Sequence, residues 1–279
     1  FTRRWIAQEF GLYDILIATA VLLGAAQTAT IILQVQHGHG GHAAELSIDQ
    51  NIDTLMFKWI NLIIYFRAIW VVKMSILTLF HRIGSGMRGF PWILHSLVVW
   101  VISIFTTLFA ISTVLAKIFT CTPISRPWDV ERLPTGCVYA DGFNITQASI
   151  NVFTDFVLLI LSMPLARLLE VTRKQRGMPA LVVIFSIGVI PLAASVKRLS
   201  VVLISAVGKG ETWLNADTSW KWAYVPLWSQ IEVDVGIMAA SLPSLTPLLK
   251  QMWSGFIRYK SMTPSRIRTL TRPRESWGL

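Results

Sequence analysis

The sequence predicts an all-α fold, a polytopic membrane helix bundle with six spans. Of the 279 residues, 53% are apolar and only 14% are charged, whereas an average soluble domain carries about 25% charged residues. A soluble fold must cover its surface with polar groups, and this composition supplies too few of them. Six long apolar stretches each reach the roughly 20 residues that a helix needs to cross the hydrocarbon core. The solvent around the fold is therefore predicted to be lipid.

The first three predicted spans are apolar along nearly their whole length. Residues 12–35 form the first span, which ends just before a His-Gly run at His37 to His42. Residues 56–80 form the second span and residues 91–118 the third. The connections between spans are short, so no soluble domain is expected between them.

The last three predicted spans carry more polar residues. They cover residues 144–168, 180–206 and 225–249. Polar residues in the first of these recur at spacings of three and four, which places them on one helical face. This stripe consists of Asn144, Gln147, Asn151, Thr154 and Asp155. We therefore expect that face to be wet or hydrogen-bonded.

Basic residues set the predicted orientation. Lys and Arg concentrate on the cytoplasmic side of membrane proteins, and 15 of the 25 here lie on the side of the C-terminal tail, against six on the other side. The sequence predicts a helix bundle over residues 1–250 and a basic cytoplasmic tail over residues 251–279. We expect the tail to meet anionic lipid headgroups and not nucleic acid. Whether the membrane is the plasma membrane or an endomembrane stays open.

Two groups of potential ligand residues lie on the predicted outer side. Cys121 and Cys137 share one connection there, in a compartment that permits oxidation. A disulfide and two free thiols are both compatible with this spacing. His37, His39 and His42 could form a metal site, but a Gly-rich turn with solvated histidines is favoured. No metal is predicted.

Charged residues inside the predicted spans are expected to meet one another. A lone charge at mid-membrane costs at least about 2.5–3.5 kcal/mol, so such residues usually face the bundle interior and pair. Counted from the outer ends of the spans at about 1.5 Å per residue, five charges fall at one level: Arg67, Asp155, Arg198, Glu232 and Asp234. We expect Arg198 to pair with one of the three acids, first of all with Glu232. Lys73 is expected to snorkel toward the cytoplasmic side and to stay outside this cluster.

This charged cluster has two interpretations. It is either an ion-pair network that fixes helix register or the polar floor of an outward-facing ligand cavity inside the bundle. Glu232 and Asp234 lie about 200° apart around a helix, so we expect them to have different partners. Under the second interpretation, the predicted ligand-binding residues are Arg67, Asn151, Asp155, Arg198, Trp228, Glu232 and Asp234.

Short motifs along the chain carry a resemblance to a known family. They are Tyr13-Asp14, Gly38, Gly40, His42, Lys73-Met74-Ser75-Ile76, Arg82-Ile83, Cys121-Thr122-Pro123, Trp128-Asp129, Gly136-Cys137, Asn151, Thr154-Asp155, Pro164, Ser195 to Leu199, Trp228-Ser229, Ile231-Glu232, Val235-Gly236, Leu242-Pro243 and Pro247-Leu248. From Phe1 to about Lys250 the sequence resembles the fungal rhodopsin-like domain family. That family includes the membrane proteins named after the satratoxin cluster and pathogenicity-related receptor-like proteins.

The resemblance implies a seven-helix rhodopsin-like bundle, whose first helix would precede the opening of this chain. It also implies a disulfide between Cys121 and Cys137. One departure is that Asp234 stands where the family usually has Asn. Retinal needs a Schiff-base lysine in the last helix, and residues 224–249 contain none. No cofactor is therefore expected.

Two functions compete at this point. The first is a receptor-like sensor, in which a small, mainly apolar ligand shifts helix packing that a cytoplasmic signalling protein reads. The second is an intramembrane enzyme of fungal secondary metabolism, a cyclase or isomerase with Glu232 or Asp234 as its candidate acid. A transporter is weaker, because no inverted repeats are evident. We favour the sensor, while the enzyme stays open.

Overall fold

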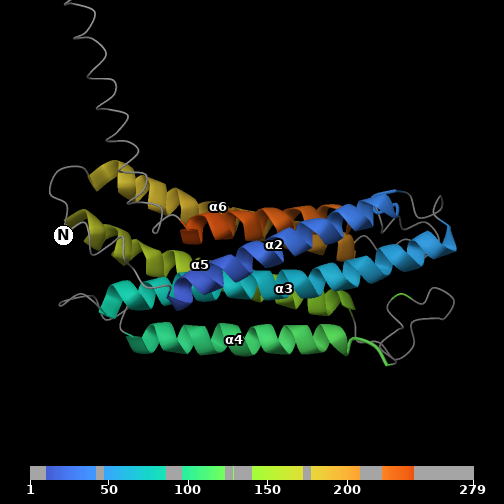
Figure 1. The fold of residues 1–279 in the computed structure, drawn as a ribbon, viewed down its shortest axis with the longest axis horizontal. Coiled ribbons are helices and arrows are strands. Elements are labelled where there is room, and N and C mark those ends of the chain that lie inside the picture. Colours follow the sequence, from blue (N-terminus) through green and yellow to red (C-terminus); the bar gives the residue numbers. More distant parts are fainter. Residues whose placement is uncertain are drawn as a thin grey trace, which may run out of the picture. The chain divides into compact units, whose positions relative to one another are not determined.

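The computed structural model describes residues 11–41, 47–85, 96–122, 128, 140–171, 177–207 and 222–241. Every regular element in these ranges is a helix (Figure 1). The labelled helices are α2 (Leu12–Gln36), α3 (Ile48–Ser85), α4 (Ser96–Ile118), α5 (Ala140–Val171) and α6 (Gly177–Val207). A further helix covers residues 224–241 and is called the 224–241 helix below. The predicted all-α fold is confirmed.

Four of the described helices, α2, α3, α5 and α6, extend beyond the predicted spans. In the part of the chain that the structure describes, five helices are long and apolar enough to cross a membrane: Leu12–Gln36, Ile48–Arg82, Ser96–Ile118, Asp141–Met163 and Gly188–Ala206. The sixth predicted span, 225–249, is helical as far as residue 241, and the rest lies outside the described residues. Hydropathy marks only the part of a helix in hydrocarbon, so it misses the polar first turns of α3.

The start of α3 shows why that helix begins outside its predicted span. Ser47 and Gln50 form a capping box: the Gln50 side chain accepts from the Ser47 amide at 3.1 Å, and the Ser47 hydroxyl accepts from the Gln50 amide at 3.4 Å. These bonds satisfy two amides that a helix start leaves without partners. The 38 residues of α3 span about 57 Å at 1.5 Å per residue, well over the roughly 30 Å of the hydrocarbon core.

The side chains of α4 are distributed as lipid requires. Large apolar residues such as Leu97, Trp100, Ile104 and Leu108 are about half to two-thirds exposed, and their spacing places them along one side of the helix. The residues of α4 that are buried include Ser103, Thr106, Thr113 and Lys117. Hydroxyl groups inside and apolar groups outside suit a helix surrounded by acyl chains.

The central helix of the bundle is α3. In its most apolar window 56% of the residues are buried, against 17% in α2 and 22% in α4. Apolar side chains of α3 pack in separate clusters against α4 and the 224–241 helix, against α4 and α5, and against α2. Residues placed on α3 can therefore reach most of the other helices.

The 224–241 helix approaches α3 closely at Gly236. A Cβ atom built there would lie 2.8 Å from Cγ1 of Val72, which is closer than real side chains pack. Only glycine permits this spacing, which brings the helix backbone onto α3 one turn away from Glu232. On the α2 side the Tyr13 hydroxyl donates to the carbonyl oxygen of Ala240. The helix is thus fixed between α2 and α3.

The turn after α2 differs from the solvated turn that the sequence suggested. Gly38 and Gly40 adopt φ of 93° and 94°, a region that favours glycine. The two ring nitrogens of His39 are buried and have no hydrogen-bond partner among the described residues. Burial, together with the nearby charge of Lys58, lowers the pKa of His39 from 6.5 to about 4. His39 is therefore neutral at physiological pH.

Several predictions fall at the edge of the described residues. The chain divides into the units Phe1–Ala240 and Ser241–Leu279, and everything described here except Ser241 belongs to the first. The predicted boundary at residue 250 and the basic tail lie outside the described residues, as do His42 and Cys137. Cys121 is buried and is not a free thiol. Its pairing with Cys137 stays a prediction.

Candidate functional site

Glu232 is the meeting point of three helices inside the bundle. Its side chain is fully buried. Tyr65 of α3 donates its hydroxyl to Oε2 at 3.0 Å, and Asn151 of α5 donates Nδ2 to Oε1 at 2.6 Å. A buried polar group without such partners costs about 1–3 kcal/mol. The carboxyl group therefore joins α3, α5 and the 224–241 helix.

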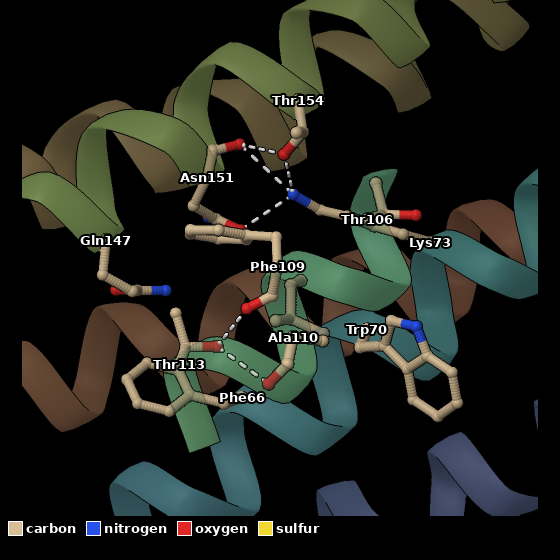
Figure 2. Close-up of a pocket in the computed structure, with 11 residues that line it drawn as sticks. Phe66, Trp70, Lys73, Thr106, Phe109, Ala110, Thr113, Gln147, Asn151 and Thr154 are labelled. Atoms are coloured by element: carbon tan, nitrogen blue, oxygen red, sulfur yellow. Dashed lines mark hydrogen bonds between the residues drawn. The ribbon is translucent and has the colours of Figure 1, made fainter. Parts of the chain in front are cut away.

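Lys73 of α3 binds the polar face of α5. Its Nζ forms an ion pair with Oδ1 of Asp155 at 2.8 Å. It also donates to Oδ1 of Asn151 at 2.8 Å and to Oγ1 of Thr154 at 2.6 Å (Figure 2). Ser195 of α6 donates its hydroxyl to the other oxygen of Asp155. The Nζ of Lys73 also donates to the Asn151 carbonyl oxygen at 3.2 Å, so four oxygens surround the three protons of the ammonium group.

The prediction that Lys73 snorkels outward is wrong. Only 6% of its side chain is exposed. Snorkelling carries the charge to an aqueous interface, but here α5 offers a carboxylate and three neutral oxygens within reach of the same side chain. The ion pair expected for Arg198 is thus made by Lys73.

Arg198 of α6 is connected to Glu232 through the neutral side chain of Tyr65. It donates to the Tyr65 hydroxyl at 2.9 Å and to Oε1 of Gln147 at 3.0 Å, and its guanidinium lies 4.2 Å from the centre of the Tyr65 ring. No ion pair joins Arg198 to an acid among the described residues. The predicted direct pair with Glu232 is therefore wrong, because the Tyr65 hydroxyl lies between the two groups.

These contacts form one polar network from four helices. Its members are Tyr65, Lys73, Gln147, Asn151, Thr154, Asp155, Ser195, Arg198 and Glu232. Two cationic side chains and two carboxyl groups lie in it, so their charges can compensate one another away from water.

The predicted ligand residues divide into two groups. Asn151, Asp155, Arg198 and Glu232 belong to the network. Arg67, Asp234 and Trp228 do not: Arg67 and Asp234 are exposed, and Trp228 is half-buried. Asp234 accepts from Nε2 of Gln230 at 2.9 Å, beside Gly24 of α2. The predicted divergence of Glu232 and Asp234 is therefore confirmed, whereas the common cluster of five charges is wrong.

A small cavity adjoins this network between α3, α4 and α5 (Figure 2). Its volume of about 20 Å³ accommodates roughly one water molecule. The lining residues are Phe66, Ile69, Trp70 and Lys73 of α3, then Thr106, Phe109, Ala110 and Thr113 of α4, then Gln147, Asn151 and Thr154 of α5. The wall is thus mostly apolar on α3 and α4 and polar on α5.

Sequence reasoning missed Tyr65 and underrated Gln147. Tyr65 lies in an apolar run and looks like a core aromatic, although its hydroxyl has two charged neighbours. Gln147 belongs to the polar stripe but carries no charge, so the cost of burying a charge gives no reason to place it in the cluster. The stripe itself was the usable signal, since three of its members line the cavity. In the described part of the chain, no group of three or more His, Cys, Asp or Glu residues could hold a metal ion.

Comparison with known proteins agrees with this architecture. The family model "Fungal rhodopsin domain" matches residues 1–251. A "SAT4 family membrane protein" of Emericella nidulans is 26% identical over 220 residues, which cover 78% of this chain and 52% of that protein. "Wortmanamides biosynthesis cluster protein C" of Talaromyces wortmannii is 21% identical over 274 residues, which cover 95% of this chain and 70% of that protein.

The chain therefore spans about half the length of the first of these relatives. No solved structure matches it significantly. The family match covers most of the chain, and the described residues contain five helices that could cross a membrane. The chain is a multi-pass membrane protein and belongs to the fungal rhodopsin domain family.

Proposed function

We propose that the chain is a receptor-like sensor that binds a small, mainly apolar ligand in the cavity between α3, α4 and α5. One observation carries this proposal. Lys73, Gln147, Asn151 and Thr154 line the cavity and are also members of the polar network. A ligand in the cavity would touch the side chains that join four helices.

The lining suits an apolar ligand with a polar end. Phe66, Ile69, Trp70, Phe109 and Ala110 offer apolar contact, and α5 offers the polar groups. Such a mostly apolar wall with a few convergent polar groups is typical of small-molecule sites. At about 20 Å³, the cavity admits only part of a ligand unless its side chains move, so binding would change their contacts.

Asn151 is the residue through which binding would change helix packing. It accepts from Lys73 and donates to Glu232, so a shift of its side chain alters contacts with both α3 and the 224–241 helix. Losing one such buried contact costs about 1–3 kcal/mol, which is the usual size of an allosteric coupling energy. A ligand that moves Asn151 would therefore have enough energy to shift a two-state equilibrium.

The proposed partners are membrane lipid, the ligand and a signalling protein at the cytoplasmic side, where we place the basic tail. Nucleic acid is not among them. The alternative function is an intramembrane enzyme of secondary metabolism, which the name of the Talaromyces relative favours. Neither candidate acid lines the cavity, since Glu232 lies behind Tyr65 and Asn151 and Asp234 is exposed. This arrangement supports the sensor over the enzyme.

Metabolite profiling of a deletion strain, compared with capture of cytoplasmic partners by the tagged chain, separates the two functions. Under the proposal, deletion changes a cellular response without accumulation of a precursor, and a partner is captured. Asp234→Asn should preserve the response, because Asp234 lies outside the cavity and the network. Accumulation of one precursor in both the deletion strain and the Asp234→Asn strain would instead support the enzyme.

A further inference from the structure

We infer that the cavity takes a neutral compound dissolved in the membrane, whose acceptor oxygen, such as a carbonyl, enters sideways past Trp70 of α3 and Phe109 and Ala110 of α4 and binds Nε2 of Gln147. This inference rests on the cavity being a ligand site, as proposed above. It adds the chemical class of the ligand, its anchoring group and its route.

The orientation of the Gln147 amide follows from its partner. Oε1 accepts from Arg198 at 3.0 Å, and a guanidinium group can only donate. The oxygen must therefore face Arg198, which turns the NH₂ group the other way. Figure 2 shows the amide nitrogen turned toward the space between the lining side chains.

The Gln147 NH₂ group is the donor left for a ligand. No hydrogen bond from Nε2 is seen among the described residues, and Nε2 is absent from the buried polar atoms that lack a partner. The other donors of the wall are engaged: Lys73 with α5, Trp70 with Thr107, and Thr113 with backbone carbonyls. An acceptor oxygen on the ligand would give the Gln147 NH₂ group a hydrogen-bond partner.

The size of the cavity restricts what enters. About 20 Å³ holds a group the size of a water molecule or a carbonyl oxygen. The apolar remainder of the ligand would then lie against exposed side chains of α4 such as Phe105, which stacks with Phe109 of the wall. An ionised group is disfavoured there, because the two cations of the network already have carboxyl partners or hydrogen bonds to a bridging hydroxyl.

The access route follows from the position of the cavity along the helices. Its α4 residues, Thr106 to Thr113, lie near the middle of α4, and its α5 residues lie near the middle of the Asp141–Met163 span. Toward the cytoplasmic end, Val99 of α4 packs with Leu158 and Leu161 of α5. Toward the other end, Val114 and Ile118 of α4 share a cluster with Phe143 of α5.

Both ends of the cavity are thus closed by apolar packing. Among its lining residues Trp70, Phe109 and Ala110 are partly exposed, and all three lie at mid-membrane depth. Their exposure is to the hydrocarbon, not to water. The cavity therefore opens sideways into the bilayer, which differs from the outward-facing cavity that the sequence suggested.

A pair of matched photoprobes tests this inference. Both have the same 18-carbon chain, diazirine and alkyne handle, but one carries a mid-chain ketone and the other a methylene at that carbon. The full chain is reconstituted in phosphatidylcholine nanodiscs, labelled at increasing probe concentration and digested for mass spectrometry. We expect saturable labelling of α3 and α4 around the mouth by the ketone probe, and non-saturable labelling of lipid-facing surfaces by its twin.

Two variants test the anchor and the route. Gln147→Glu keeps an oxygen toward Arg198 but replaces the NH₂ donor. It should raise the probe concentration at half-saturation about 3- to 10-fold, which is the effect of losing one hydrogen bond. Ala110→Phe fills the mouth and should abolish saturable labelling. The matched control is Ala116→Phe on the exposed side of α4, which should label as the parent chain does.

The outcomes distinguish the claims. Equal saturation by both probes, blocked by Ala110→Phe, would overturn the acceptor anchor while preserving the cavity as a ligand site. Saturation that Ala110→Phe does not reduce would overturn the sideways route. No saturation by the ketone probe would overturn the ligand class, even where the chain purified from its own membrane retains a different compound in the cavity.

Discussion

Replacing Tyr65 by Phe tests whether the network stabilises the bundle as its geometry indicates. The change removes one hydroxyl and leaves the ring that Arg198 covers. Without it, the guanidinium loses an acceptor at 2.9 Å and Glu232 loses a donor at 3.0 Å, both in a buried site. Hydrogen bonds to charged groups contribute about 1.5–3 kcal/mol each. We therefore expect a loss of about 3–5 kcal/mol in the free energy of unfolding.

Thermal unfolding of the full chain in one detergent measures this loss, which corresponds to roughly 6–20 °C for a chain of this size. Tyr13→Phe is the matched control, because the hydroxyl that it removes donates to a neutral acceptor, the Ala240 carbonyl. That control should cost about 1 kcal/mol. If Tyr65→Phe lowers the free energy of unfolding no more than Tyr13→Phe does, the Tyr65 hydroxyl does not bridge the two charged groups.

Three further predictions concern the ion pair, the close helix contact and the turn after α2. Lys73→Met should lower the free energy of unfolding by about 3–5 kcal/mol. The double variant Lys73→Met/Asp155→Asn should lose at least about 1 kcal/mol less than the sum of the two single variants; strict additivity in urea titrations would show that the two side chains do not interact. Gly236→Ala should cost about 1–3 kcal/mol, because its Cβ would meet Val72 at 2.8 Å, whereas Gly24→Ala, with its nearest contact at 3.4 Å, should be neutral or stabilising; equal thermal stabilities would contradict this contrast. Since the pKa of folded His39 is lowered to about 4, the unfolded chain binds the proton first and stability should fall as pH decreases from 6.5 to about 4; a His39→Gln chain with the same pH profile would refute it.

Hydropathy was sufficient to predict the helices, because each span must satisfy its backbone hydrogen bonds internally and be apolar over the thickness of the bilayer. The ends of the helices were not predictable in this way. The first turns of α3 are polar and gain their stability from the Ser47–Gln50 capping box, so they do not register as a membrane span.

The depth of a residue was also predictable, but the direction in which it points was not. Asp155, Arg198 and Glu232 were expected at one level, and all three belong to the network. Arg67 has nearly the depth of Tyr65 but lies about 200° around the helix from it, and it is exposed. The rotation of a helix about its axis depends on packing against its neighbours, which one sequence does not reveal.

Lys73 shows the same limit for a long side chain. Seven residues separate it from the end of the predicted span, which favours snorkelling, yet α3 continues to Ser85 and the stripe of α5 lies closer than the interface. The cation nearest to Asp155 could be identified only once α3 and α5 were placed side by side.

An experimental structure of the full chain, purified from its own membrane with no compound added, tests the central claim most directly. The proposal predicts density for a bound molecule between α3, α4 and α5, in contact with Gln147 and Asn151, with the bonds of Asn151 to Lys73 and Glu232 altered from those seen here. A cavity filled by the protein's own side chains or by one water, with the Asn151 bonds unchanged, would contradict it.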